Sequence, residues 1–388
     1  MKSTQSKRLF PLDALRGLII AFMALDHANY FIAQHHSPGE YWGGSFPAYS
    51  SALPFLTRLV THFCAPGFFF LMGAGMLLFA EARWRQGWNM WQIRGHFWLR
   101  GIVLIALQLL VVNPIWKAGP GFFPERYIGV LIALGGTMIL GSFLFQLNPI
   151  ALLILTLGLL VGTEWLHPRP EMWGTLNNDP WNLVLMRSGG DGELWSNFPI
   201  LPWLELVVFG MLFGRWLLDD EKKAYQKGLW LGIALLVLFA ILRYADGFGN
   251  IRPREGNTWI DFLNVVKYPP SLTFTFLTTG INLIVFWGFS KTGNPSTGFR
   301  QAQPGGSRQG FQTASRPLVA FGSAPLFVYI LHLFLYMLIG RFIAPHGMSI
   351  PSMYPYWLTS LALLYPLALW YGRFKYSQTP LRRVLAYL

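Results

Sequence analysis

Long apolar runs alternate with short polar segments along most of the chain. A bilayer core about 30 Å thick requires roughly 20 mostly apolar residues in each helix that crosses it, and ten segments approach this length. They are Leu15–Phe31, Leu53–Phe79, Phe97–Trp116, Tyr127–Phe145, Ile150–Leu166, Pro199–Leu218, Gly228–Tyr244, Pro269–Ser290, Pro317–Gly340 and Tyr354–Gly372. The pattern therefore predicts an all-α, polytopic membrane helix bundle with about ten transmembrane helices.

The distribution of Lys and Arg predicts how this bundle is oriented. An even number of spans places both termini on one side, and cytoplasmic loops carry an excess of basic residues. With cytoplasmic termini, four basic residues fall in each of five inner segments: the N-terminus, the segments after spans two, six and eight, and the C-terminal tail. These segments then hold 20 of the 30 Lys and Arg residues and leave 10 outside. We therefore expect the N- and C-termini in the cytoplasm.

Composition supports a membrane protein and excludes several other classes. Of the 388 residues, 53% are hydrophobic and 12% are charged, about half the roughly 25% charged share of soluble proteins. A disordered or collagen-like chain is excluded, and the single Cys64 excludes a disulfide scaffold. The net charge of +13 is spread over short loops between spans, which is typical of topology signals. We therefore expect no nucleic-acid partner.

The hydrophilic stretches are too short for a separate soluble domain. The longest are His167–Phe198 and residues 291–316, both below the roughly 50 residues that a domain needs. The second is rich in Gly, Gln, Ser and Pro and indicates a flexible cytoplasmic linker. Residues 1–388 are thus expected to form one integral-membrane domain. A cleaved signal peptide is the alternative for the first span, but no clear cleavage site follows it.

Ionisable side chains inside spans are functional candidates, because a bilayer tolerates them mainly in the bundle interior or in a wet cavity. Five such residues occur: Asp26, His27, His62, Glu205 and His332. At about 1.5 Å per residue, all five fall at or beyond the midplane, on the predicted outer side. Pro66 leaves the carbonyl of His62 without its helical donor, and irregular backbone at membrane depth is tolerated where it lines a cavity. His62 and this kink together predict a site.

Each candidate also has a purely structural interpretation. A buried His can bridge neighbouring helices by hydrogen bonds, and Glu205 can extend to the interface. Asp26 and His27 diverge by about 100° on a helix, so one of them can serve to orient the other. His35 and His36 lie in the first outer loop, where a solvated turn is the default. No ligand spacing supports a metal site, for which the available groups are His27, His62, Cys64 and His332.

Several motifs resemble one family of membrane acyltransferases. The most specific are Arg8-Leu-Phe-Pro-Leu-Asp-Ala-Leu-Arg-Gly-Leu, Met23-Ala-Leu-Asp-His and Thr61-His-Phe-Cys-Ala-Pro in the first two spans. Further matches are Leu201-Pro-Trp, Lys267-Tyr-Pro-Pro-Ser-Leu and Ala324-Pro-Leu-Phe-Val-Tyr-Ile-Leu-His. Over essentially the whole chain, the sequence resembles the catalytic domain of heparan-α-glucosaminide N-acetyltransferase and its bacterial relatives.

The resemblance implies an integral membrane acyltransferase, in a bacterium an enzyme of the inner membrane. Cytoplasmic acetyl-CoA would donate the acetyl group, without a metal, to an amino sugar or glycan acceptor on the other side. In the lysosomal enzyme the essential His lies in the loop after the first catalytic span, which corresponds to His35 or His36. By the same resemblance, the lysosomal enzyme has Asn at the position that corresponds to His27 and Asp at the position that corresponds to His62. The choice of the catalytic His therefore stays open.

The candidate residues suit acyl transfer. Imidazole, with an ordinary pKa of about 6.5, can take the proton of the acceptor at neutral pH. We therefore expect His27 or His62 to act as the base, with Asp26 or Glu205 to orient it. Hydrogen bonds to the developing oxyanion are expected from His62, His332 or Arg58.

Arg16 and Arg100, at the predicted inner side, are the expected ligands for the phosphates of CoA. Asp13 and Arg16 stand at helical i,i+3 spacing, which predicts an ion pair. The alternative function is a transporter for an anionic or amphipathic solute that uses the same cluster, although such proteins usually show repeats. A structural or export-complex subunit is a third possibility. The acceptor, the acyl chain, an acyl-His intermediate and a homo-oligomer are left open.

Overall fold

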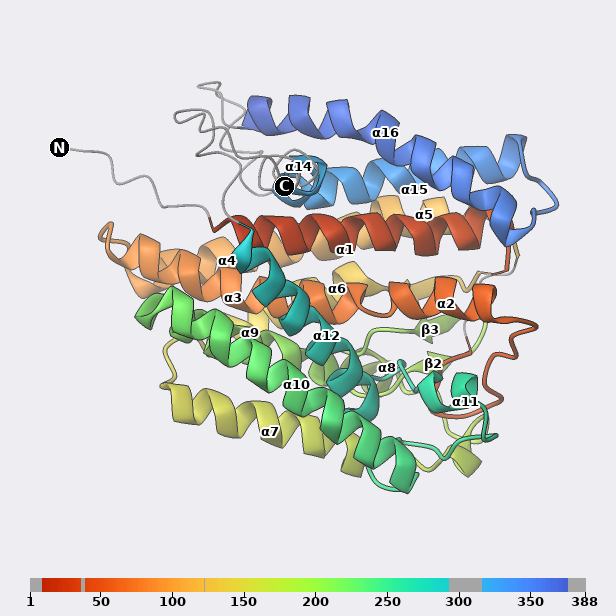
Figure 1. The fold of residues 1–388 in the computed structure, drawn as a ribbon, viewed down its shortest axis with the longest axis horizontal. Helices are drawn as coiled ribbons and strands as arrows, with labels where there is room; N and C mark the ends of the chain where they lie inside the picture. Colours follow the sequence, from red (N-terminus) through yellow and green to blue (C-terminus); the bar gives the residue numbers. More distant parts are fainter. Residues whose placement is uncertain (1–8, 36–38, 122, 293–315, 376–388) are drawn as a thin grey trace.

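The computed structural model describes residues 9–35, 39–121, 123–292 and 316–375, and helices dominate it (Figure 1). The α-helices are α1 (Phe10–Ala28), α2 (Ala52–Thr61), α3 (Cys64–Trp84), α4 (Met90–Leu107), α5 (Asn113–Lys117), α6 (Val130–Gly141), α7 (Pro149–Leu166), α8 (Pro180–Leu185), α9 (Ile200–Asp219), α10 (Glu221–Ala245), α11 (Trp259–Leu263), α12 (Leu272–Lys291), α14 (Arg316–Ser323), α15 (Pro325–Phe342) and α16 (Ile350–Lys375). Two π-helices, η1 (Asn29–Ala33) and η2 (Gln108–Val112), and a 3-10 turn, η3 (Pro170–Met172), complete the helical elements among these residues.

Helices occupy all ten predicted spans. Within the described residues, seven helical segments are long and apolar enough to cross a membrane: α2–α3, α4–α5, α7, α9, α10, α12 and α15. The other three predicted spans correspond to α1 with η1, to α6, which has only 12 residues, and to α16, which contains Pro355 and Pro366. The protein is thus a mostly helical integral membrane protein. Nearly all of the predicted linker, residues 293–315, lies outside the described residues.

Helix α1 lies in the middle of the molecule (Figure 1). Helices α14, α15 and α16 lie on one side of it, and α3, α9, α10 and α12 lie on the other side. Two glycines allow α1 and α14 to pack backbone to backbone: a Cβ on Gly17 would overlap the carbonyl of Leu318, and a Cβ on Gly322 would overlap that of Asp13. The side chains of α1 are therefore enclosed by other helices, and most of them are buried.

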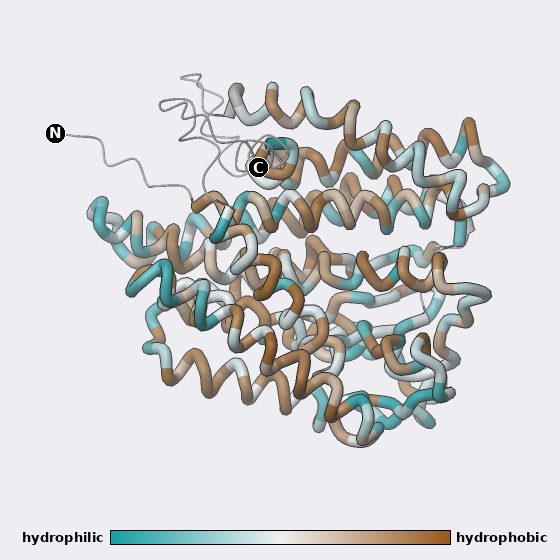
Figure 2. Tube along the Cα trace, in the orientation of Figure 1, coloured by the Kyte–Doolittle hydropathy of each residue, from teal (hydrophilic) through white to brown (hydrophobic). Residues whose placement is uncertain are grey.

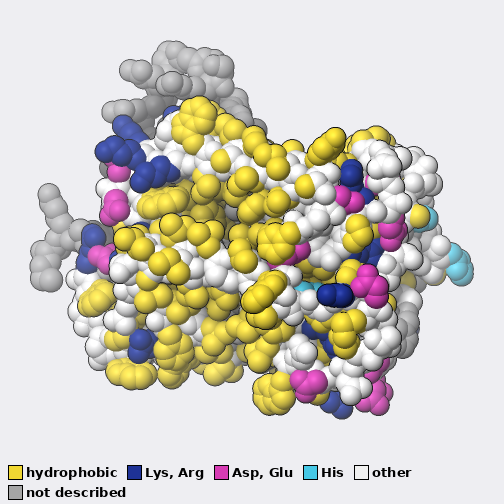
Figure 3. All heavy atoms as spheres, turned by 90° about the horizontal axis from the view of Figure 1, so that it is seen from below, with side chains coloured by type: hydrophobic (Ala, Val, Ile, Leu, Met, Phe, Trp, Pro, Cys, Tyr) yellow, Lys and Arg dark blue, Asp and Glu magenta, His cyan; other side chains and the backbone are white. Residues whose placement is uncertain are grey.

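The outermost helices present an apolar surface. On α7 and α10, Ile154 and Val237 are 66% and 53% exposed, which is expected of side chains that face lipid rather than water. Hydrophobic side chains cover the middle of this face, and charged ones gather towards its two ends (Figure 3). Hydrophilic residues likewise concentrate at the ends of the helices and in the loops (Figure 2). These patterns match a bilayer that surrounds the middle of the bundle.

The two ends of the bundle differ in structure. We call the end where α1 begins the N-terminal face, and α16 ends there too (Figure 1). The opposite end, the far face, carries a small sheet that the all-α prediction did not include. In this sheet β3 (Leu194–Ser196) pairs in parallel with β1 (Arg126–Ile128) and antiparallel with β2 (Gly189–Gly190). The long polar segment between α7 and α9 therefore folds back onto the bundle.

Candidate active site

The second predicted span is interrupted in the middle, as the proline kink predicts. Helix α2 ends at Thr61 and α3 starts at Cys64, so the helix breaks just before Pro66. Beside the break, the carbonyl of Phe63 accepts a hydrogen bond from Asn282 Nδ2 on α12 (3.0 Å). The side chains around the break, including Thr61 and Cys64, line a cavity. The irregular backbone at membrane depth thus borders a cavity, as such backbone must.

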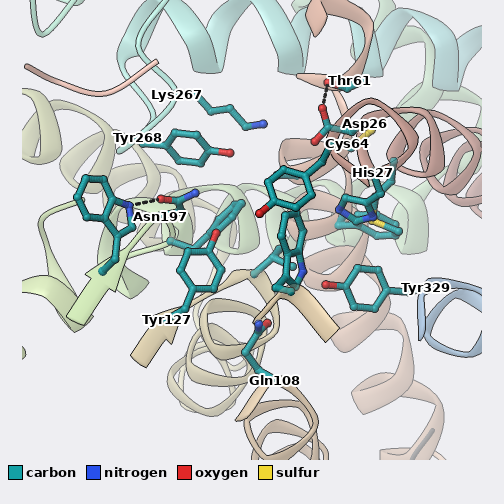
Figure 4. A pocket seen from close by; sticks show the side chains of 18 of the residues that line it. Asp26, His27, Thr61, Cys64, Gln108, Tyr127, Asn197, Lys267, Tyr268 and Tyr329 are labelled. Atoms are coloured by element: carbon teal, nitrogen blue, oxygen red, sulfur yellow. Dashed lines mark hydrogen bonds between the residues drawn. The ribbon is translucent and has the colours of Figure 1, made fainter. Parts of the chain in front are cut away.

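This cavity, which we call the His27 cavity, has a volume of about 300 Å³ and is shown in Figure 4. It lies on the far-face side, because Tyr127 of β1 and Trp195 of β3 line it. Its polar lining includes Asp26, His27, Thr61, Gln108, Asn197 and Lys267. Its aromatic lining includes Tyr30, Tyr41, Trp116, Tyr127, Trp195, Tyr268 and Tyr329. Gln108 starts one π-helix and Tyr30 belongs to the other, and such irregular turns are frequent at functional sites.

A second cavity, the Arg16 cavity, has a volume of about 360 Å³ and lies nearer the N-terminal face. Arg16 and Arg100 provide its charges, and Ser323 adds a hydroxyl. Most of the remaining wall is apolar, with residues such as Ile20, Leu71, Met72, Phe79, Phe97 and Leu104. Arg16 donates hydrogen bonds to Asp13 (3.1 Å) and to the carbonyl of Gly322 (3.1 Å), which confirms the predicted ion pair.

The two cavities adjoin end to end. Four side chains line both of them: Met23, Phe68, Val130 and Tyr329. We call these four residues the neck. Helix α1 and the π-helix η1 line the whole course, and five of their wall residues stand three or four positions apart: Arg16, Ile20, Met23, His27 and Tyr30. Residues at this spacing share one face of a helix, so one stripe of α1 leads from Arg16 past the neck to His27.

His27 forms a buried pair with His332 of α15. The two rings are stacked, and His27 Nδ1 lies 2.7 Å from His332 Nε2. His332 Nδ1 lies 2.7 Å from the carbonyl oxygen of Val328. Because a carbonyl only accepts, His332 must carry its proton on Nδ1. With both imidazoles neutral, His332 Nε2 then accepts from His27 Nδ1, and the unprotonated nitrogen of His27 is Nε2.

Asp26, although next to His27 in sequence, belongs to a separate network centred on Arg58. Arg58 donates to Asp26 (2.6 Å) and to both carboxylate oxygens of Glu40 (2.7 Å each). Thr61 also donates to Asp26 (2.7 Å), and His62 Nε2 lies 3.7 Å from Glu40. Burial alone would raise the pKa of Glu40, but the Arg58 guanidinium outweighs it and lowers this pKa to about 2. The network thus keeps Arg58 and Glu40 charged although both side chains are buried.

Glu40 also brings a distant loop segment to the cavity. Its carbonyl accepts hydrogen bonds from the backbone N–H groups of Lys267 (2.9 Å) and Tyr268 (3.0 Å). Trp42 N–H donates to the carbonyl of Tyr268 (3.1 Å), so the two segments run side by side in parallel. Lys267 is 4% exposed and lines the His27 cavity. Burial, with the nearby Arg58, lowers the pKa of Lys267 to about 8.

The other predicted residues lie elsewhere. His62 and His332 are buried but line neither cavity, and the same holds for Arg58. Glu205, also buried, accepts from Thr275 (2.9 Å) between α9 and α12, away from both cavities. His35 is exposed, and His36 lies outside the described residues. In the part of the chain that the structure describes, no three His, Cys, Asp or Glu side chains gather as metal ligands.

Sequence reasoning missed several groups of the site. Glu40 and Lys267 are charged residues just outside spans, where a solvated position is the default. Asn197 and Gln108 are uncharged, and polar amides in loops or spans carry no specific signal. Lys267 opens one of the motifs that resemble the family, and this was the available signal for it.

The chain was also compared with known proteins. The family model described as "Heparan-alpha-glucosaminide N-acetyltransferase, catalytic" matches residues 8–241, which is more than half of the 388 residues. The matched part contains α1 to α9 and most of α10. It therefore includes Asp26 and His27, the two catalytic candidates on α1. No curated protein matches the sequence. The chain therefore belongs to this family of membrane acetyltransferases.

Proposed function

We propose that the protein transfers an acetyl group from acetyl-CoA, bound in the Arg16 cavity, to an amine or hydroxyl of a sugar acceptor in the His27 cavity. His27 is the general base of this reaction. Family membership supports acetyl transfer, and the paired cavities support two substrates that arrive from opposite sides. The aromatic side chains of the His27 cavity provide flat apolar faces on which a sugar ring can stack.

One observation carries this proposal: His27 stands one helical turn beyond Met23, a residue of the neck that both cavities share. A thioester that reaches the neck from the Arg16 cavity would meet the acceptor beside His27. General base catalysis requires hydrogen-bond reach to the proton that is taken. His35, in contrast, is exposed outside both cavities.

The Arg16 cavity suits acetyl-CoA as a substrate. The apolar wall fits the pantetheine arm, and the two guanidinium groups fit phosphates, which Arg binds through several N–H donors. The Nε–H of Arg100 is buried and has no hydrogen-bond partner within the described residues, so it can still donate to a ligand oxygen. The excess of Lys and Arg in the predicted inner segments supports a cytoplasmic position for the N-terminal face.

In the proposed reaction, His27, His332 and Tyr329 have different roles. His27 Nε2 takes the proton of the acceptor while the acceptor nitrogen or oxygen bonds to the acetyl carbonyl carbon. The carbon–sulfur bond breaks, and the thiolate of CoA receives the proton back from His27. His332 holds the tautomer of His27 that this requires. The Tyr329 hydroxyl, which points into the cavity (Figure 4), can donate to the developing oxyanion at the neck.

The proposal is tested with the purified full chain in lipid nanodiscs, acetyl-CoA and glucosamine. Free CoA thiol and acetylated product are measured together, because a transporter would bind solute without forming either. His27→Ala is expected to lower kcat by about 10²- to 10⁴-fold, as removal of a general base does. The matched control is His346→Ala, at an exposed His outside both cavities.

The residues that the family resemblance indicates are tested in the same assay. A double variant, His35→Ala with His36→Ala, should keep nearly full activity. If this variant loses activity while His27→Ala keeps it, the base is a loop His and our assignment is wrong.

A further inference from the structure

Lys267 is a buried cation for which the proposed mechanism has no use. Its side chain lines the His27 cavity, and its Nζ lies 5.1 Å from the ring centre of Tyr268. Within the described residues, Nζ makes neither an ion pair nor a hydrogen bond. The carboxylates whose charge acts on Lys267, Asp26 and Glu40, are bound by Arg58 instead. A buried charge is costly unless it is paired, so this ammonium is suited to an anion that enters the cavity.

Asn197 adds a second donor to the same wall. Its Oδ1 accepts from Tyr41 (2.6 Å) and from Trp195 Nε1 (2.8 Å). Because an indole N–H can only donate, these bonds fix which end of the amide is the oxygen. The Nδ2 group therefore faces away from Tyr41 and Trp195, into the cavity that Asn197 lines (Figure 4).

The donors and the base occupy different sides of the cavity. In Figure 4, Lys267, Tyr268 and Asn197 lie on one side, and Asp26 and His27 lie on the other. We propose that the acceptor carries an anionic group, either a carboxylate or a phosphate or sulfate ester, that binds to Lys267 and Asn197 while its amine or hydroxyl lies at His27. This inference rests on the proposed function and adds the class of the acceptor. It makes Lys267 a residue that determines specificity.

The inference predicts a difference between acceptors in one assay. Acetyl transfer is measured with glucosamine, glucosamine 6-sulfate, glucosamine 6-phosphate and muramic acid, which bears a carboxylate. The wild-type protein should have a lower KM for at least one anionic acceptor than for glucosamine. The three anionic probes distinguish a carboxylate from the two esters. No transfer to any probe would contradict the proposed function, whereas equal KM values for glucosamine and all anionic probes would overturn only this inference.

Substitution of the cation should remove the preference. Lys267→Met should raise KM for the preferred anionic acceptor roughly 10- to 100-fold, the usual value of a hydrogen bond to a charged group. It should change KM for glucosamine less than about threefold, because glucosamine has no anionic group and loses no such hydrogen bond. Lys267→Arg should restore part of the preference. The matched control is Lys223→Met, at a lysine whose side chain is 79% exposed near the N-terminal face. Equal losses for both acceptors would overturn the inference.

A second variant keeps the test valid if Lys267→Met does not fold. Asn197→Asp keeps the two accepted hydrogen bonds but replaces the inward-facing donors by negative charge. It should raise KM for the anionic acceptor and leave that for glucosamine almost unchanged. An unchanged KM for the anionic acceptor would count against binding of its anionic group by Asn197 and Lys267.

The pH dependence gives an independent readout. The charged or titratable groups around Lys267 are Asp26, Glu40, Arg58, His62, Cys64 and Tyr268. Because burial and Arg58 lower the pKa of Lys267 to about 8, the free protein loses this positive charge as the pH rises through 8. KM for glucosamine 6-sulfate, whose sulfate stays charged, should then rise relative to KM for glucosamine. Lys267→Met should abolish this relative rise, and a rise that persists in the variant would contradict the role of Lys267.

Discussion

The two cavities on either side of the neck are built in different ways. The Arg16 cavity is enclosed by regular helices, and most of its wall is apolar apart from two guanidinium groups and a few polar atoms. The His27 cavity combines helices, both π-helices, the small sheet and the segment around Lys267. Its polar side chains come from positions far apart in the chain. The regular cavity suits a long substrate with an anionic end, and the irregular one suits chemistry and selection.

The difference follows from what each backbone can offer. In a regular helix the N–H and C=O groups are bonded to each other, so only side chains remain for recognition. Where α2 and α3 separate, and where η1 and η2 interrupt the regular pattern, side chains such as Thr61 and Gln108 reach the cavity. Irregularity is concentrated around the His27 cavity because that cavity must hold several polar groups in fixed positions.

The largest expected effect concerns the tautomer of His27. His332→Leu removes the acceptor for His27 Nδ1–H, so the proton can move to Nε2 and disable the base. We expect kcat to fall about 10²- to 10⁴-fold, with KM for acetyl-CoA nearly unchanged. His332→Gln, whose amide oxygen can accept the same hydrogen bond, should restore a substantial part of kcat. Equal losses in both variants would indicate that His332 serves only for packing.

The next effect concerns the charge network behind the His27 cavity. Because the pKa of Glu40 is lowered from 4.5 to about 2, its contribution to stability is complete above about pH 4.5 and is lost as the pH falls towards 2. At 1.36 kcal/mol per pKa unit, this amounts to about 3 kcal/mol. The midpoint of thermal unfolding should therefore fall more steeply between pH 4.5 and pH 2 in the wild type than in Glu40→Gln. The control is Glu193→Gln at an exposed position, and equal slopes for wild type and Glu40→Gln would refute this role.

Obstruction of the neck should separate the two cavities functionally. Val130→Trp adds bulk between them, so the thioester can no longer reach His27. We expect transfer to fall about 10²-fold, the cost of a small misplacement of reacting groups. Binding of acetyl-CoA, measured by thermal shift, should persist. Val237→Trp, on the exposed surface of α10, is the matched control and should keep full activity. Normal transfer in Val130→Trp would mean that the substrates meet elsewhere.

Much of the helical framework is predictable from the sequence. All ten predicted spans coincide with helices, because apolar length is a local property and the bilayer imposes it. Asp26, His27 and the kink at Pro66 identify part of the His27 cavity for the same reason: an ionisable group or a broken helix at membrane depth needs an enclosed polar environment. Among the described residues, seven segments are long and apolar enough to cross a membrane individually. Whether the other three predicted spans also cross it depends on how their helices pack, and not on length and apolarity alone.

The missing parts of the site depend on long-range contacts. Glu40 and Lys267 are brought together by backbone hydrogen bonds between loops that are far apart in sequence. No local sequence pattern predicts such a pairing. The five predicted ionisable groups share an apolar environment in sequence, yet only His27 and His332 contact each other directly. The position of each group along its helix follows from the sequence, whereas the direction in which each helix faces is decided by packing, for example of α1 against α14 through Gly17.

The smallest expected effect concerns the charged end of the Arg16 cavity. Arg100→Gln removes a guanidinium whose Nε has no hydrogen-bond partner within the described residues, so little of the fold depends on it. KM for acetyl-CoA should rise about 10-fold, as expected for one hydrogen bond to a charged phosphate, while kcat should change little. Dephospho-CoA derivatives should show whether the contact is to the ribose phosphate. Arg94→Gln, an Arg of the same helix that lines neither cavity, is the control. A fall in kcat at unchanged KM would place Arg100 in the chemistry and weaken the contrast between the two cavities.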